Sequence, residues 1–75
     1  MFDHSDVWAA LDYIAEASGL SPSGLARKAG LDPTAFNRSK RTAPSGKARW
    51  PSTESLSKVL DAMDVTFEDF GHIAR

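Results

Sequence analysis

With 75 residues, 41% of them hydrophobic and 25% charged, the chain has the size and composition of one soluble globular domain spanning residues 1–75. So small a domain buries only roughly 60% of its unfolded surface, which excludes catalytic architectures that need a large scaffold. The absence of cysteine excludes disulfide bridges, cysteine-based zinc sites and thiol nucleophiles, and a formal net charge of −1 provides no overall attraction to a polyanion.

Apolar residues at helical spacing predict a first helix from about Ser5 to Ser18, which Gly19 ends. Ser21 and Pro22 then have the pattern of a helix N-cap followed by proline at the first helical position. A second helix is therefore predicted from Pro22 to Gly30. At about nine residues this helix must pack against the rest of the chain to be stable.

Asp32 and Pro33 repeat the cap and the proline directly after the second helix. They predict a third helix from Asp32 to about Ser39, with Phe36 facing the interior. Because so few residues separate the second and third helices, we expect the two to cross at a large angle.

The segment from Lys40 to Pro51 contains two prolines, one glycine and no apolar periodicity, which predicts a loop. Ser52 caps a fourth helix, and Thr66 with Asp69 has the pattern of a capping box that opens a fifth. No segment alternates between apolar and polar residues as a strand would. The expected fold is all-α, a compact bundle of five short helices.

The basic residues gather in the middle of the chain. Seven basic residues and one acidic residue lie between Ala26 and Arg49, a net charge of +6, whereas the remaining residues carry −7. Such a block is either a solvated face or a surface that binds phosphates.

The second and third helices carry a recognisable set of residues: Leu25, Ala26, Gly30, Leu31 and Phe36. On these positions the unit from 22 to 39 resembles the helix-turn-helix of the lambda-repressor-like (Xre) family of bacterial and phage transcriptional regulators. The segments SDVWAALDYIA, SGLARKAGLDPTAFNRSKR and RWPSTESL look more narrowly like the DNA-binding domain of alphaproteobacterial repressors whose longer chains carry a LexA-like peptidase domain.

This resemblance implies sequence-specific binding of double-stranded DNA by a transcriptional regulator, expected to be a repressor, with the third helix in the major groove. It implies base-reading positions early in that helix and one turn later: Thr34, Ala35, Asn37 and Arg38. The alternative for Asn37 and Arg38 is contact with phosphates.

Contacts with the DNA backbone are assigned to basic residues and to two serines at the start of the second helix. These are Ser21, Ser23, Arg27, Lys28, Lys40, Arg41, Lys47 and Arg49.

The sequence departs from the family pattern in two places. Pro22 and Pro33 stand where many relatives have glutamine, so the contacts of those glutamines cannot be carried over. The basic loop 40–51 is longer than the usual connection, and the family assigns it no role. Its Trp50, which precedes a proline at a helix entrance, is expected to pack into the core.

Small modules of this kind gain affinity by binding two half-sites, so a weak homodimer or a pair formed on DNA is expected. The apolar stripe of the fifth helix is the candidate self-association surface, although the core could also take its residues: Phe67, Phe70 and Ile73.

No arrangement of residues predicts catalysis, a metal site or a cofactor. His4 and His72 lie at opposite ends of the chain without the spacing of metal ligands. No apolar run approaches the roughly 20 residues of a membrane span, and the start lacks the features of a signal peptide. We therefore expect a cytoplasmic protein at the bacterial nucleoid, with no membrane partner.

Two other interpretations remain open. The two proline replacements and the acidic ends favour a protein-interaction adaptor or antitoxin-like module on the same scaffold. The 75 residues are alternatively a fragment of a longer repressor.

Overall fold

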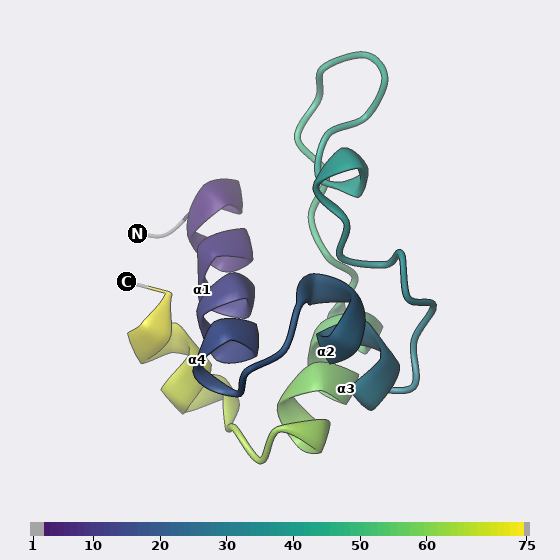
Figure 1. The fold of residues 1–75 in the computed structure, drawn as a ribbon. Coiled ribbons are helices and arrows are strands. Elements are labelled where there is room, and N and C mark those ends of the chain that lie inside the picture. Colours follow the sequence, from purple (N-terminus) through teal and green to yellow (C-terminus); the bar gives the residue numbers. More distant parts are fainter. Residues whose placement is uncertain (1–2, 75) are drawn as a thin grey trace.

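The computed structural model describes residues 3–74, and these residues adopt an all-α fold (Figure 1). The described elements are α1 (His4–Ala17), α2 (Pro22–Lys28), the 3-10 helix η1 (Arg38–Lys40), α3 (Thr53–Ala62) and α4 (Phe67–Ile73). Four α-helices therefore form within residues 3–74, in place of the five expected.

Each α-helix begins at a short polar residue whose side chain binds a free backbone N–H of the first turn. Ser21 accepts from the Gly24 amide and Ser52 from the Ser55 amide, both as the sequence predicted. Thr66 opens α4 with a complete capping box. α1 begins at His4, because the carboxylate of Asp3 caps it.

The predicted third helix, from Asp32 to about Ser39, is wrong as an α-helix. Its backbone hydrogen bonds span three residues, from the Ala35 amide to the Asp32 carbonyl and from the Asn37 amide to the Thr34 carbonyl. Asn37 then adopts an extended conformation, with φ −60° and ψ 144°, and separates this turn from η1. A turn and a short 3-10 helix thus replace the predicted helix.

The core lies where α1, α2 and α3 meet, and its largest fully enclosed side chains are Phe36, Leu11, Leu25 and Val59. Phe36 is 2% exposed, so it faces the interior as predicted even though it lies in a turn. Ala26 is fully buried between its neighbours, where a larger side chain would not fit. α4 packs against α1 and contributes Phe70 to the same core.

Candidate nucleic-acid interface

Residues 41–49 form a hairpin, here called the basic arm, which projects from the helices beyond η1 (Figure 1). The Ala43 amide donates to the Lys47 carbonyl at 2.8 Å, and an antiparallel bridge joins Thr42 to Ala48. The turn begins with proline after Ala43, and Gly46 follows with φ 85°. A β-turn followed by a left-handed glycine is a common hairpin connection, so the predicted loop has a defined backbone.

The first strand of the basic arm is fixed to α1 through Arg41. Its guanidinium donates two hydrogen bonds to the carboxylate of Asp12, at 2.8 and 2.7 Å, and a third to the Phe36 carbonyl at 3.0 Å. The guanidinium carbon also lies 4.6 Å from the centre of the Trp8 ring, a cation–π contact. Arg41 is consequently 9% exposed.

These contacts correct the prediction that Arg41 binds the DNA backbone. A guanidinium enclosed by a carboxylate, a carbonyl and an indole ring cannot also reach a phosphate, so Arg41 is structural. Conversely, the hydrogen bonds from Arg41 hold the pKa of Asp12 below its usual value, and the charges of Arg41 and Arg38 lower it further.

The second strand of the basic arm is fixed to α1 through the carbonyl oxygen of Arg49. The indole N–H of Trp8 donates to this oxygen at 2.9 Å. Nε2 of His4 lies 2.7 Å from the same oxygen and 2.9 Å from the Arg41 carbonyl. Nε1 of Trp8 also lies 3.0 Å from Nε2 of His4, so the two ring nitrogens and the Arg49 carbonyl oxygen form one polar cluster at the base of the basic arm.

His4, Trp8 and Asp12, here called the anchor residues, therefore lie one above another on a single face of α1. Sequence reasoning did not identify this role. The signal was their spacing of four residues, which puts three hydrogen-bonding side chains on one helix face. Their acceptors and donors lie 29 to 45 residues further along the chain, where periodicity does not reach.

The four residues assigned to base reading have different surroundings. The Thr34 hydroxyl donates to Asp32 at 2.6 Å, which leaves it only as an acceptor and lowers the pKa of the Asp32 carboxyl. Ala35 packs against the core, and Asn37 is half-buried. Arg38 is exposed, which makes its guanidinium the most accessible donor of the four.

Arg38 lies at the edge of a hollow of about 240 Å³ beside the carboxyl-terminal half of α1 and the start of α2. Asp12 and Glu16 line the same hollow. The carboxylates reduce the attraction of this hollow itself for an anion, so an anionic partner of Arg38 has to approach from the solvent side.

The other residues predicted to contact the DNA backbone do not form one continuous surface. Arg27 and Lys28 lie in the last turn of α2, whose end is remote from the basic arm (Figure 1). The Ser21 and Ser23 hydroxyls bind each other at 3.1 Å, and Ser21 also caps α2. By contrast, η1 leads directly into the basic arm, so this part of the chain collects four exposed cations: Arg38, Lys40, Lys47 and Arg49.

The three candidate self-association residues differ in how far they are exposed to solvent. Phe70 is 4% exposed and belongs to the core, which corrects its assignment to a contact surface. Phe67 is 56% exposed, and Ile73 is half-buried. Trp50 is 53% exposed, so its predicted burial is also wrong.

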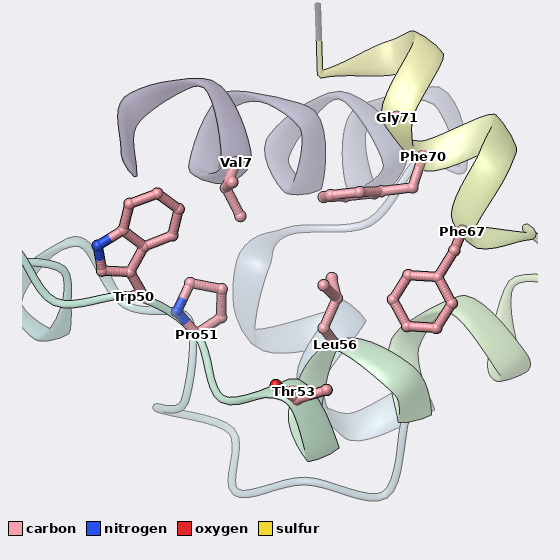
Figure 2. A pocket seen from close by; sticks show the side chains of 8 residues that line it. All are labelled: Val7, Trp50, Pro51, Thr53, Leu56, Phe67, Phe70 and Gly71. Carbon is pink, nitrogen blue, oxygen red and sulfur yellow. The ribbon is translucent and has the colours of Figure 1, made fainter. Parts of the chain in front are cut away.

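Trp50 and Phe67 lie on opposite sides of an apolar hollow of about 290 Å³ between α1, α3 and α4 (Figure 2). The remaining lining residues are Val7, Pro51, Thr53, Leu56, Phe70 and Gly71.

Within residues 3–74, histidine and carboxylate side chains nowhere form a group of three or more that could hold a metal ion. In the same residues no helix has the length and apolar character to cross a membrane. No family model matches the sequence, and neither the curated proteins nor the solved structures include a match to it.

Proposed function

We propose that this protein binds double-stranded DNA sequence-specifically and acts as a transcriptional regulator, specifically a repressor. The observation that carries the proposal is the segment from η1 through the basic arm, where Arg38, Lys40, Lys47 and Arg49 are exposed and no acidic residue occurs. Exposed cations on a projecting backbone match the regular phosphates of a duplex, and phosphate contacts supply most non-specific affinity.

Sequence readout is assigned to the segment 32–40, placed in the major groove as the second part of a helix-turn-helix. Arg38 can donate to O6 and N7 of guanine, and Asn37 can pair with adenine. Thr34 is left to accept a hydrogen bond or to contact a thymine methyl. Lys40, Lys47 and Arg49 then contact phosphates, which fix the register of the protein on the duplex.

The experiment is a fluorescence anisotropy titration of a labelled random-sequence duplex at several salt concentrations. The proposal predicts binding at low salt that weakens steeply as salt rises, since each phosphate contact adds about 0.9 to the slope of log K against log salt. Affinity that is absent at low salt, or independent of salt, would contradict it.

Base readout and phosphate contact are separated by two variants. Sites are first selected from a random duplex pool with the wild-type protein. Arg38→Ala should relax the preference at one base pair by about 1–3 kcal/mol, whereas Lys47→Ala should weaken all sequences alike and lower the salt slope by about 1. If both variants produced the same uniform loss, the assignment of Arg38 to base reading would be wrong.

A second candidate function is a protein-interaction adaptor or antitoxin-like module, and the apolar hollow with its exposed Trp50 and Phe67 favours it. Apolar area of this kind is a frequent feature of protein contacts. The salt titration separates the two functions, because a module that contacts only another protein would show no salt-dependent binding of the duplex.

A further inference from the structure

We infer that the basic arm is a preformed second DNA contact, held by the anchor residues of α1 so that Lys47 and Arg49 meet the sugar-phosphate backbone at a fixed offset from Arg38. The inference rests on the proposed function. It assigns a binding role to residues 41–49 and a positioning role to His4, Trp8 and Asp12.

The backbone of the arm is set before any partner binds. Its inner hydrogen bonds are the Ala43 amide to the Lys47 carbonyl, the Gly46 amide to the Ala43 carbonyl and the Arg49 amide to the Arg41 carbonyl, at 2.8, 2.8 and 3.0 Å. A short isolated hairpin is at best marginally stable in water. The arm therefore depends on its attachment to the helices.

Side chains of α1 contact both strands of the hairpin at its base. Asp12 holds Arg41 on the first strand, and Trp8 and His4 hold the Arg49 carbonyl on the second. Because both sides of the hairpin are attached to one rigid helix, its tilt and its twist are restricted. A basic arm without this restriction would lose conformational entropy on binding, and this loss would reduce its affinity for DNA.

The charge of the arm identifies its partner as a polyanion. Lys47 and Arg49 are exposed, and the one arginine of the arm that has a carboxylate partner, Arg41, is buried at its base. The apolar side chains expected for a protein partner are lacking, because the outward residues of the arm are small or polar: Thr42, Pro44, Ser45 and Ala48. The partner that fits is the backbone of duplex DNA, continuous with the site of Arg38.

The experiment tests positioning without touching a cation. Asp12→Asn frees Arg41 from its ion pair, and Glu16→Gln removes the same charge from the next turn of α1, where Glu16 is exposed and forms no salt bridge with the arm within residues 3–74. On net charge alone both variants should bind DNA slightly more tightly. If Asp12 positions the arm, Asp12→Asn should instead lower the salt slope by about 1 to 2, as though arm cations had been lost.

The comparison is completed with the double variant Lys47→Ala/Arg49→Ala, which should lower the slope by about 2. Adding Asp12→Asn to this double variant should change the slope no further, since the arm contacts are already absent. Circular dichroism confirms that each variant is folded at the temperature of the titration. If Asp12→Asn does not fold, Trp8→Phe takes its place, because it keeps an aromatic ring at this position and removes the N–H that binds the Arg49 carbonyl.

The outcomes separate the two proposals. Wild-type binding to the random duplex with an unchanged slope in Lys47→Ala/Arg49→Ala overturns the role of the arm, together with the phosphate contacts assigned to Lys47 and Arg49, and leaves DNA binding through Arg38 and Lys40 standing. Equal behaviour of Asp12→Asn and Glu16→Gln overturns the positioning role. No salt-dependent binding by the wild type overturns the proposed function, and the inference falls with it.

Discussion

Asp12 and Arg41 form a bidentate ion pair whose side chains are 32% and 10% exposed. An ion pair on the open surface contributes little to stability, because water screens it and two flexible side chains must be ordered. Here Arg41 is enclosed and also binds the Phe36 carbonyl, so removing Asp12 would leave a desolvated charge without its counter-ion. The pair therefore affects the stability of the fold mainly because removing one partner leaves the other as an uncompensated charge.

The Asp12–Arg41 ion pair makes the stability of the fold depend on pH in acid solution. Because the pKa of Asp12 is lowered from 3.8 in the folded state, its contribution to stability is complete above that value and is lost as the pH falls through the folded pKa. We expect Asp12→Asn to reduce the free energy of unfolding by about 1–2 kcal/mol at neutral pH. The difference from wild type should shrink progressively below about pH 5.

Urea denaturation at a series of pH values measures this difference. Glu54→Gln is the matched control, since Glu54 pairs with Lys58 at 3.2 Å but both side chains are exposed. It should change the free energy of unfolding by less than about 0.5 kcal/mol throughout. A deficit in Asp12→Asn that stayed constant down to the acid limit would show that the ionised carboxylate is not what stabilises the fold.

At the scale of the element, the turn of the basic arm depends on one backbone conformation. Gly46 has φ 85°, and a Cβ added there meets no atom within 4 Å. A substitution is therefore opposed by backbone strain alone, of about 1–2 kcal/mol for most residues, and not by a steric clash. Asparagine tolerates this region better than alanine does.

We accordingly predict that Gly46→Ala weakens DNA binding more than Gly46→Asn, while thermal unfolding of the helical core hardly differs between the two. The reason is that strain at the tip distorts the hairpin but leaves the attachments to α1 and the core intact. Anisotropy titration and a circular dichroism melt measure the two effects. Equal affinities for Gly46→Ala and Gly46→Asn would mean that the conformation of the tip is irrelevant to binding.

The segment 32–40 carries the helix-start signals Asp32 and Pro33, but the chain forms only a turn and η1 there. The Asp32 carboxylate already accepts a hydrogen bond from the Thr34 amide at 2.8 Å. The backbone hydrogen bonds of the turn span three residues, one fewer than those of an α-helix. Asn37, with ψ 144°, is the residue that interrupts the winding.

We predict that helical circular dichroism increases when the protein binds its selected duplex, as residues 32–40 wind into one helix. Asn37→Pro should abolish the increase, because proline retains the φ of −60° found at Asn37 but has no N–H. It therefore loses the present hydrogen bond to the Thr34 carbonyl and cannot continue a helix. Asn37→Ala, which also lacks the amide side chain, should retain it. Unchanged ellipticity of the wild type on binding would instead indicate that this segment meets DNA as a turn.

At the scale of the whole molecule, the net charge of −1 is the sum of separated regions. The arm and η1 project exposed cations at one end, whereas the apolar hollow bordered by Phe67 and Trp50 is formed by α1, α3, α4 and the chain that enters α3. The two surfaces are built from different residues, so the proposed DNA contact would leave the apolar hollow available for a contact between copies.

The prediction at this scale is that Phe67→Ser reduces cooperative binding to a duplex with two selected sites without changing affinity for a single site. The exposed ring of Phe67 can bury apolar area in a second copy, and serine cannot. Tyr13→Ser is the control, since Tyr13 is 60% exposed, much like Phe67 at 56%, and lines a different hollow with Ile73. If Tyr13→Ser and not Phe67→Ser reduced cooperativity, the contact surface would lie at Tyr13.

Caps and apolar periodicity act between residues close in the chain, so the all-α class, the caps of α2, α3 and α4 and the inward position of Phe36 followed from the sequence alone. Local signals also predicted a helix from Asp32 that the backbone does not form, since the extended Asn37 interrupts it. Which cations remain exposed depends on contacts between residues far apart in the chain. Arg41 and Lys47 look alike in the sequence, but contacts across 29 residues bury Arg41 against Asp12 and leave Lys47 on a hairpin in solvent.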